Sequence, residues 1–552
     1  MAETSRLKRG SRISALAFAC ALVGSFAAGS STSSAAKTQG GRVLLVGTYK
    51  GHAGKYATIQ AAVDAARPGD WLLVAPGDYH ETADVAHPPT SDSHGAFGGV
   101  LITTSSIHLR GMNRASVIVD GTKAGSSSPC SADAAQQNFG AVGPDGQPYG
   151  RNGILVSKAN DVSVENLTTC NFLGGAGEAG NGIWWNGGAD SGTIGLHGYT
   201  GSYLTATSTY YGGESTAATY GIFSSNARGP GSWDQVYASN FNDSGMYVGA
   251  CLQVCDVTIN HAWMEYSALG YSGTNSGGAI VVENSEFDNN KDGFDTNTQI
   301  HGDPPAPQNG ACPGNRVSPI THTHSCWVFM DNYVHDNNNP NVPALGSAAA
   351  GPVGTGMSIS GGRNDTVMHN RFVNNNAWGV IFVPYPDTET PPSNAPACTG
   401  GISGPNNACT YDDWGNALLN NSFSKNGSYR NDTNGDFAEI TFTPGNPINC
   451  YRGNTDTSGT VTSSPSNLQS TNSNCGQTAT TSDPNPSFLN QVLCDSQFSG
   501  TPCPPGANYP TRQTVIMHPL PKHLATMPNP CAGVPANPWC PARKHKRKGT
   551  RA

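Results

Sequence analysis

Short stretches in which apolar and polar residues alternate recur along most of the chain, and they predict β-strands rather than helices. Alternation with a period of two is typical of strands, whose successive side chains point to opposite faces. Between Asn152 and Thr441 the stretches share one order: an apolar–Asn–aromatic element, polar residues, then Gly and a short apolar strand. This order is found at residues 239–248, 284–295, 332–359 and 370–382, and 421–423 begins one more. The chain is therefore expected to repeat one strand-based unit.

The spacing of the units predicts stacked coils of three strands each. Glycines mark the spacing: Gly245, Gly270 and Gly293 lie 25 and 23 residues apart, and Gly356 and Gly379 lie 23 apart. Three short strands joined by tight turns, at about 3.3 Å per residue, use roughly this many residues for one coil. Asparagine is absent before Asn113 and dense from Asn152 to Asn449. Its tolerance of left-handed backbone suits equivalent turns, although Asn also marks ordinary loops.

The N-terminal part of the chain, before the repeat, predicts a small helix followed by strands. Residues 56–66 form an amphipathic pattern that places Ile59, Ala62, Val63 and Ala66 on one face. Thr58 is a suitable N-cap, and residues 67–70 (Arg-Pro-Gly-Asp) end the helix. Strands are expected at 71–74, 107–111 and 117–121. A solenoid exposes its core at each end, so we expect the helix to cover the first coil.

The segment Tyr56 to Glu81, "YATIQAAVDAARPGDWLLVAPGDYHE", resembles the N-terminal cap of the pectin-lyase-like superfamily. The shared features are Ile-Gln before the helix centre, then Pro-Gly-Asp, then Val-Ala-Pro-Gly-x-Tyr. "VIVDGT" at 117–122 and the later Asn-rich units fit the same superfamily, and the resemblance spans roughly residues 50–445. It implies an all-β fold: a single-stranded, right-handed parallel β-helix, or three-sided solenoid, with an N-terminal helical cap. It does not imply one activity, because such helices include lyases, glycosidases, esterases, epimerases, tailspikes and adhesins.

Five segments are expected along the chain. Residues 1–36 have the basic start, apolar middle and small-residue end of a secretory signal peptide, so the protein is expected to be secreted. A membrane anchor is the alternative, but the apolar stretch is short. Residues 37–95 then form the N-terminal cap, and 96–445 form the β-helix with loop insertions. Residues 446–542 are a Cys- and Pro-rich region that covers the far end of the coils, and 543–552 are a basic tail.

Cysteine usage agrees with export, since 14 of the 15 cysteines remain once Cys20 leaves with the signal peptide. Zinc is the competing interpretation, but the chain has no CxxC pair. The sequence does not fix their connectivity, but pairs of neighbouring cysteines would close short loops. These pairs are Cys251–Cys255, Cys312–Cys326, Cys398–Cys409, Cys450–Cys475, Cys494–Cys503 and Cys531–Cys540, and Cys130–Cys170 would complete the set.

Composition and charge narrow the possible partners. Only 12% of residues are charged, while 68 Gly and 38 Pro argue against a helical protein or a coiled coil. Without residues 1–36 the chain carries 26 basic and 37 acidic residues. Such a surface repels nucleic acid, and it repels acidic polysaccharide unless a cation bridges the two. We expect a monomer that neither binds nucleic acid nor inserts into a membrane.

The densest group of candidate chemical residues lies in "DNNKDGFDTNTQIHGD", residues 288–303. With Phe294 pointing into the coil, Asp295 points outward, where hard carboxylate oxygens suit Ca²⁺. Asp288, Asp292 and Asp295 are thus candidate calcium ligands. A uronate lyase needs a cation beside the substrate carboxylate and a base that removes the adjacent proton. Lys291 and Asp295 are the candidate catalytic residues.

Two alternatives bear on this cluster. "NKDGFD" at 290–295 resembles the Asn-Thr-Asp-Gly-x-Asp stretch of polygalacturonase-type glycosidases. The adjacent Asp pair, the Gly-His-Gly and the Arg-x-Lys of that family are missing here, so a lyase is favoured over a hydrolase. In the other interpretation, the Asp and Asn residues only stack at turns along the coil.

Aromatic and imidazole side chains complete the expected site. Trp184, Trp185 and Tyr247 are candidates for stacking on sugar rings, and His301 is a fourth candidate for substrate binding. Core packing is the simpler role for at least half of such rings. The sequence thus predicts a secreted β-helix that binds polysaccharide, with calcium-assisted lyase chemistry as one interpretation. The alternative is a non-catalytic extracellular structural or adhesive protein.

Overall fold

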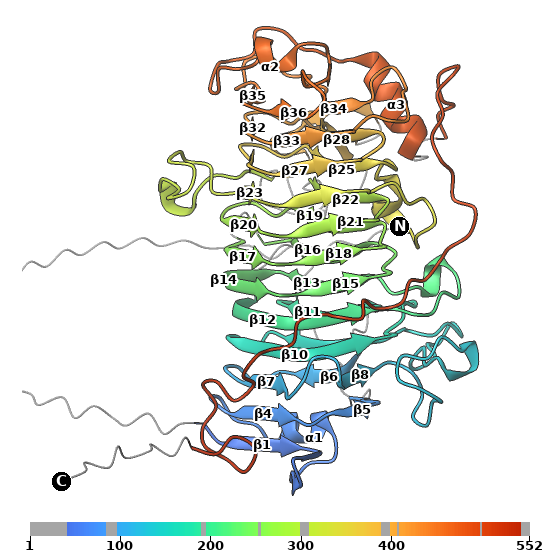
Figure 1. The fold of residues 1–552 in the computed structure, drawn as a ribbon, viewed down its shortest axis with the longest axis vertical. Coiled ribbons are helices and arrows are strands. Elements are labelled where there is room, and N and C mark those ends of the chain that lie inside the picture. Colours follow the sequence, from blue (N-terminus) through green and yellow to red (C-terminus); the bar gives the residue numbers. More distant parts are fainter. Residues whose placement is uncertain are drawn as a thin grey trace, which may run out of the picture. The chain divides into compact units, whose positions relative to one another are not determined.

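In the computed structural model, three parallel β-ladders run along the whole body of the protein (Figure 1). The structure describes residues 41–83, 97–188, 195–251, 255–298, 308–387, 398–405, 408–496 and 500–542. The predicted signal peptide, the basic tail and His301 lie outside these residues. From the coil of β4 onward, each coil contributes a strand or half of a long strand to each ladder, and we name the ladders the first, second and third faces. The fold is the predicted right-handed parallel β-helix.

The strands of each face pair in parallel with the coils before and after them. The first face holds β1 (Val43–Val46), β4 (Trp71–Val74), β7 (His108–Gly111), the first half of β10 (Val162–Cys170) and of β12 (Leu196–Thr207), β14 (Ala227–Asp234), β17 (Val257–Asn260), β20 (Ile280–Glu283), β23 (Val328–Met330), β26 (Thr366–Met368), β32 (Ala417–Leu419) and β35 (Cys450–Arg452). The second holds β5 (Gly77–Tyr79), β8 (Val117–Asp120), the second halves of β10 and β12, β15 (Tyr237–Ser239), β18 (Trp263–Glu265), β21 (Glu286–Asp288), β24 (Tyr333–His335), β27 (Arg371–Val373), β33 (Ser422–Ser424) and β36 (Thr455–Asp456).

The third face is an eleven-stranded sheet. It holds β6 (Gly98–Ile102), β9 (Asn152–Ser157), β11 (Ile183–Asn186), β13 (Tyr220–Ser225), β16 (Ser244–Gly249), β19 (Leu269–Thr274), β22 (Asp292–Asn297), β25 (Thr355–Ser360), β28 (Trp378–Val383), β34 (Gly435–Glu439) and β37 (Ser463–Ser464). The ladders thus begin before residue 96 and continue past residue 445, because β1 and β4 in the cap region and β35 to β37 already pair as coil strands.

The glycines that set the repeat stack directly on one another at the start of the third face. A Cβ on Gly270 would lie 2.3 Å from the carbonyl oxygen of Gly293, and one on Gly293 would lie 2.5 Å from that of Gly356. Gly356 meets Gly379 in the same way, at 2.6 Å. Successive coils approach too closely there for any side chain, which explains the period seen in the sequence.

The interior is a single column of apolar side chains from all three faces. On the third face Met246, Tyr271, Phe294 and Met357 follow one another in register, so the inward direction predicted for Phe294 is confirmed. Phe287 and Phe372 share a column on the second face, with Val334 between them. Phe241 does not belong to that column, because it lies in the turn after β15, where Ser267 and Asn290 take the equivalent place in later coils.

Asparagines stack at the turns as the sequence predicts. Between the first and second faces the amide of Asn332 donates to Asn370 Oδ1 at 3.1 Å, and Asn370 donates to Asn421 Oδ1 at 3.0 Å. Asn290, Asn337 and Asn375 repeat the arrangement between the second and third faces. Each of these buried amides also bonds a backbone carbonyl, so the turns keep their polar groups paired inside the coil.

Helix α1 (Ile59–Asp64) covers the first coil, as predicted, and buries Ile59, Ala62 and Val63. The Thr58 hydroxyl caps it by accepting a hydrogen bond from the Ala61 backbone N–H at 3.2 Å. A second pair of contacts fixes its start, because the Glu81 carboxylate accepts from the backbone N–H groups of Ile59 and Gln60. The helix therefore closes the apolar end of the solenoid.

The C-terminal region covers the far end and then returns along the coils. Leu468 in α2 (Leu468–Thr471) packs on the end of the core, and α3 (Pro486–Ser496) packs beside β28 and β34. Residues 500–542, which we name the strap, run from this end back to the first coils, as the red trace in Figure 1 shows. The strap was not predicted.

Among the described residues, two antiparallel sheets lie outside the ladders. One pairs β2 (Thr48–Tyr49) with β3 (His52–Ala53), and the other holds β29 (Tyr385–Asp387), β30 (Ile402–Ser403) and β31 (Cys409–Tyr411).

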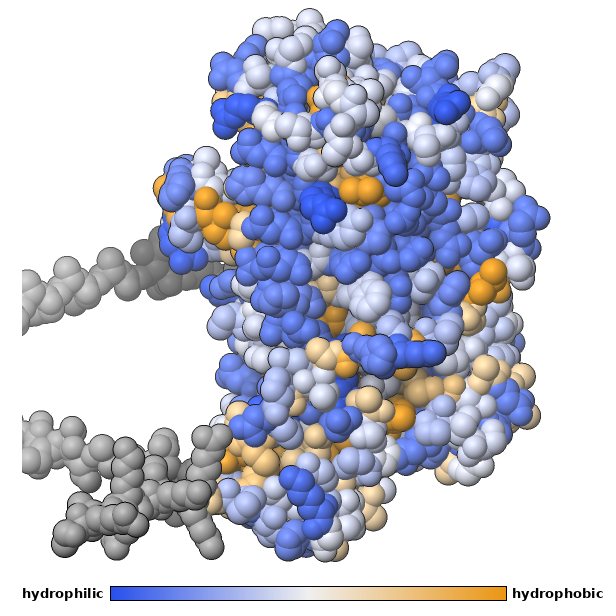
Figure 2. Space-filling model, in the orientation of Figure 1, coloured by the Kyte–Doolittle hydropathy of each residue, from blue (hydrophilic) through white to orange (hydrophobic). Residues whose placement is uncertain are grey.

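All seven predicted disulfides are present, from Cys130–Cys170 to Cys531–Cys540. Within the described residues, no helix is both long enough and apolar enough to cross a membrane. The side of the molecule drawn in Figure 2 is mainly hydrophilic, and its hydrophobic residues form scattered patches.

Candidate functional site

One column of outward-facing side chains runs along the third face. Eight successive coils contribute one residue each, and in order these are Leu155, Trp184, Phe223, Tyr247, Ser272, Asp295, Ser358 and Ile381. The first four form an apolar cluster that is separate from the core. Along the helix the column therefore changes from aromatic to acidic.

The aromatic part of the column lines a cavity of about 480 Å³. The rings of Trp184 and Phe223 stack with centroids 4.9 Å apart and planes 10° apart, and Tyr247 meets Phe223 edge-on at 4.8 Å. The Trp184 indole N–H donates to Ser225 Oγ at 3.0 Å. Trp184 and Phe223 line the cavity with Tyr220, although only 4% of Trp184 and 7% of Phe223 is exposed. The cavity thus has a rigid aromatic wall.

Polar groups face this wall. Glu178 and Glu214 line the same cavity, as do Asn181 and Asn242. In the part of the chain that the structure describes, Asn181 Oδ1 and Asn242 Oδ1 are buried and have no hydrogen-bond partner. Buried acceptors without donors are rare in proteins. Both residues line the cavity, while these two oxygens themselves lie beneath its surface.

Asp243 connects the cavity with the acidic part of the face. The Tyr220 hydroxyl donates to Asp243 Oδ2 at 3.1 Å. Burial raises the pKa of Asp243 to about 7, and the nearby carboxylate of Asp295 adds to the shift. Asp243 was not singled out in the sequence, and only its place directly before a third-face strand could have indicated it.

Asp292 and Asp295 share the hydroxyl group of Ser358, which lies on the next strand, β25. Ser358 Oγ is 2.6 Å from Asp295 Oδ1 and 3.1 Å from Asp292 Oδ2. A hydroxyl has one proton, so it can donate to only one of the two carboxyl groups. The other contact requires a proton on the carboxyl group itself.

The two carboxyl groups have different surroundings. Asp295 accepts from Ser358, from Ser360 at 3.0 Å and from the Asn297 amide at 2.9 Å, and these donors favour its ionised form. Asp292 is fully buried, and burial together with the charge of Asp295 raises its pKa well above the usual range. Burial also raises the pKa of Asp295. The arrangement is a protonated Asp292 that donates to Ser358, which donates to an ionised Asp295.

Lys291 lies beside this cluster in a separate cavity of about 330 Å³, which Arg512 also lines. Its ammonium group donates to the Ala349 carbonyl oxygen. Burial lowers the pKa of Lys291 to about 8, while the charges of Asp495 and Asp292 act in the opposite direction. Asp295 lines a neighbouring cavity of about 140 Å³, and both cavities include Ala350 and Ser496. Lys291 and Asp295 thus flank one short segment of loop.

The predicted set of three calcium ligands is not assembled. Asp288 lies on β21 in the second face, where it accepts from the Trp263 indole N–H at 2.7 Å. Asp292 and Asp295 lie on β22 in the third face. Among the residues described, no metal-ligand group joins Asp288 to these two. Asp288 is close to Asp292 and Asp295 in the sequence only because the turn between the two faces is a few residues long.

The predicted sugar-binding residues divide in the same way. Trp184 and Tyr247 lie in the outward column, as a binding role requires. Trp185 does not, because the neighbour of an outward residue on a strand points inward. It is fully buried in the core, and its indole N–H donates to the Val162 carbonyl at 3.3 Å. A contact between Trp185 and a ligand is therefore excluded.

Comparison with known proteins identifies no family. No family model matches the sequence, and no curated protein matches it. Among solved structures, the A-module of mannuronan C-5 epimerase AlgE4 from Azotobacter vinelandii is 12% identical, with a TM-score of 0.40 over 72% of this chain and 90% of that one. Pectin methylesterase PemA from Erwinia chrysanthemi is 9% identical (TM-score 0.27; 69% and 89% covered). An alginate lyase from Paenibacillus sp. str. FPU-7 is 12% identical (TM-score 0.25; 62% and 91% covered).

The protein is a parallel β-helix, the fold that the resemblance of residues 56–81 implies. Similarities as remote as these give no information on activity. Any functional argument therefore depends on the residues of the third face.

Proposed function

We propose that this protein binds a polysaccharide along the third face and that Asp295 transfers a proton in a uronate lyase-type reaction. One observation supports this above all: a single outward column joins stacked aromatic rings to the Asp292–Ser358–Asp295 cluster. Four coil steps separate Trp184 from Asp295, roughly 19 Å at the usual distance between strands. An oligosaccharide lying along the column would contact both.

The composition of the aromatic cavity supports a sugar as the ligand. Sugars have apolar C–H faces that pack against flat rings, and hydroxyl groups that need hydrogen-bond acceptors. The cavity supplies the rings of Trp184 and Phe223, and Glu178, Glu214, Asn181 and Asn242 add polar side chains to its lining.

The acidic cluster supports proton transfer. In a β-elimination, a base takes the proton next to the uronate carboxylate, and the C–H electron pair forms a carbon–carbon double bond. The glycosidic C–O bond breaks, and the leaving oxygen takes up a proton. Asp295 is the proposed base, since its raised pKa makes it a stronger base than an ordinary carboxylate. The protonated Asp292 orients Ser358, which holds Asp295 in place.

The substrate carboxylate must be neutralised in this reaction, and the protein as a whole is acidic. Lys291 and Arg512 place two cationic side chains in the cavity next to Asp295. We propose them as partners of the carboxylate, with bound Ca²⁺ as the alternative. Turnover that continues in EDTA would support the lysine and arginine, whereas turnover that requires added Ca²⁺ would support the metal.

Binding is tested first, by calorimetric titration with oligosaccharides from neutral and uronic acid polysaccharides. The Trp184→Ala variant is expected to bind about tenfold more weakly, a loss of about 1.4 kcal/mol. Trp414→Ala is the matched control, because this tryptophan lies against Arg363 in a loop insertion, away from the column. Equal affinities for Trp184→Ala and the wild type would contradict binding along the third face.

Chemistry is tested separately, by the rise in ultraviolet absorbance that accompanies an unsaturated uronate. The wild type is expected to produce it, Asp295→Asn to lose it, and the control Asp331→Asn, at an exposed turn, to keep it. Binding without any product over a panel of uronic acid polysaccharides would contradict the lyase proposal. It would favour a non-catalytic extracellular binding or adhesive protein.

A further inference from the structure

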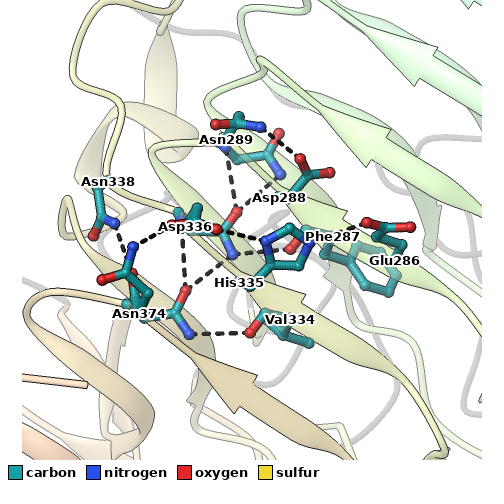
Figure 3. A network of polar contacts seen from close by, with 12 residues as sticks. Glu286, Phe287, Asp288, Asn289, Val334, His335, Asp336, Asn338 and Asn374 are labelled. Atoms are coloured by element: carbon teal, nitrogen blue, oxygen red, sulfur yellow. Dashed lines mark hydrogen bonds and ion pairs between the residues drawn. The ribbon is translucent and has the colours of Figure 1, made fainter. Parts of the chain in front are cut away.

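We propose that Glu286, Asp288 and His335, on the second face, bind a divalent transition metal ion of the Zn²⁺ class. Asp288 and His335 are direct partners on the adjacent strands β21 and β24, and Glu286 precedes Asp288 by two residues, so all three point outward. One ligand atom from each lies within 4.8 Å of the others. Figure 3 shows His335 between Glu286 and Asp336, with Asp288 nearby.

Acidic residues alone would not identify a metal site. The contacts of the His335 imidazole are the additional observation, because they require a cation. Its Nδ1 is 2.7 Å from Asp336 Oδ2, and its Nε2 is 3.0 Å from Glu286 Oε1. A neutral imidazole has one N–H, and a carboxylate can only accept. With the N–H donated to Asp336, the Nε2 lone pair faces a carboxylate oxygen. Two acceptors at this distance need a cation, which is a metal ion or a second proton on the ring.

The spacing fits two ligands of one metal ion. Zinc binds imidazole nitrogen and carboxylate oxygen at about 2.1 Å, so adjacent ligands of a tetrahedral ion lie about 3.4 Å apart. The 3.0 Å between His335 Nε2 and Glu286 Oε1 is slightly shorter, and a small outward movement of the exposed Glu286 side chain reaches that separation. The nitrogen ligand also favours zinc and similar ions over Ca²⁺ and Mg²⁺, which prefer oxygen.

Residues outside the three ligands hold them in place. Metal-binding histidines typically donate their second N–H to a carboxylate, and ligating carboxylates are themselves hydrogen-bonded. Asp336 takes the first of these roles and is itself held by the Asn374 amide. The Trp263 indole, at 2.7 Å, and the Asn289 amide, at 2.5 Å, donate to the two oxygens of Asp288. Four neighbouring coils thus contribute to one site.

The site is open to solvent on one side. The Glu286 side chain is 43% exposed and that of His335 is 13% exposed, so an ion can enter past Glu286. Three protein ligands leave at least one coordination position for water or a ligand group. The site lies on a different face from Asp295, so its presence does not depend on the proposed lyase activity.

Zinc binding is measured by calorimetric titration of the full chain with ZnSO₄. Asp78, His80 and Asp120 form a second histidine-containing group on the same face, so the comparison is made in a His80→Ala background. That protein is expected to bind one equivalent of Zn²⁺ and to melt at a higher temperature with zinc. Adding His335→Ala is expected to abolish both effects. His261→Ala is the matched control, since His261 pairs with a single carboxylate, Asp234.

Glu286→Gln is a second test that should not affect folding, because this side chain is partly exposed. It is expected to weaken zinc binding at least tenfold, and circular dichroism confirms the fold of each variant. Zinc binding that is equal in the His80→Ala protein and its His335→Ala variant would overturn the proposal. So would the absence of binding at millimolar zinc, which would identify the cluster as a protonated His335 paired with Glu286 and Asp336.

Discussion

At the scale of single residues, the acidic cluster of the third face has two carboxyl groups that contact a single hydroxyl group. Ser358 lies between Asp292 and Asp295, and only a proton on Asp292 satisfies both contacts. A second buried carboxyl group lies at the far end of the coils, where Glu439 accepts from two separate donors, Tyr451 at 2.7 Å and Asn472 at 3.0 Å. In both places burial raises the pKa of a carboxyl group.

Replacing Ser358 by Ala should reduce kcat of the proposed reaction about 10- to 100-fold and leave KM nearly unchanged. The alanine removes the donor that holds Asp295 but no group of the aromatic cavity. The measurement is steady-state kinetics on a uronic acid oligosaccharide. Ser424→Ala, a change on the second face, is the control. A higher KM at unchanged kcat would place Ser358 in binding and contradict its positioning role.

The stability of the protein should fall as the pH rises through the range in which Glu439 ionises. Burial raises the pKa of Glu439 to about 7, so the folded state holds a proton that the unfolded chain releases near its ordinary pKa of 4.5. The free energy of unfolding therefore decreases between these values, by up to about 1.4 kcal/mol per pH unit for this group. Urea unfolding of the wild type and Glu439→Gln from pH 4.5 to 8 measures it. If the free energy of unfolding changed with pH equally in the wild type and Glu439→Gln, the raised pKa of Glu439 would be contradicted.

At the scale of elements, the turns determine which residues can repeat. Asn332, Asn370 and Asn421 bond one another across coils, and the glycine column permits the close approach of successive third-face strands. Both features follow from a period of about two dozen residues, so both could be predicted from the sequence. Capping of α1 by Thr58 was also predictable, because the signal is local.

The site could be predicted only in part. Alternation along a strand gave the outward direction of Asp295 and Trp184 correctly. It could not show that Asp288 turns onto another face, because the position of each tight turn depends on the neighbouring coils. Ser358 lies 63 residues after Asp295, beyond an insertion that breaks the period, so no pattern in the sequence indicated their contact.

Gly356→Ala should destabilise the protein by about 2–3 kcal/mol, since the added methyl group overlaps backbone that cannot move. Its Cβ would lie 2.6 Å from the Gly379 carbonyl oxygen. In Gly404 the nearest atom to an added Cβ is 3.5 Å away, so Gly404→Ala should change stability by less than about 0.5 kcal/mol. Urea unfolding measures both, and equal stabilities of the two variants would contradict the stacked arrangement.

At the scale of the whole described body, the strap joins the two ends of the solenoid (Figure 1). His518 stacks on Tyr266 with ring centroids 3.7 Å apart, and Asn240 bonds the His518 backbone through both its N–H and its C=O. At the first coils Trp539 is 1% exposed, packs with Leu45, Leu73 and Met112, and donates to the His52 carbonyl. The last contact anchors the end of the strap.

Trp539→Ala should release the end of the strap without unfolding the coils. Loss of a buried tryptophan costs about 3–5 kcal/mol. Residues 525–532 keep their hydrogen bonds to Arg110 and Arg114, so only the strap after residue 532 is expected to detach. Hydrogen exchange with mass spectrometry should therefore be faster over residues 533–540, while the coil region is unchanged. Ile516→Ala, a substitution at an exposed residue on the same strap, is the control. Equal exchange rates in the wild type and Trp539→Ala would contradict anchoring by this residue.

The binding of carbohydrate along the third face is tested most directly by hydrogen exchange with and without a uronic acid oligosaccharide. Slower exchange is predicted in β11, β13, β16 and β22, the strands that carry Trp184, Phe223, Tyr247 and Asp295. The second-face strands β15, β18 and β21 should exchange at unchanged rates. Exchange that slows only in second-face strands, or in none of the coil strands, would contradict the proposed function.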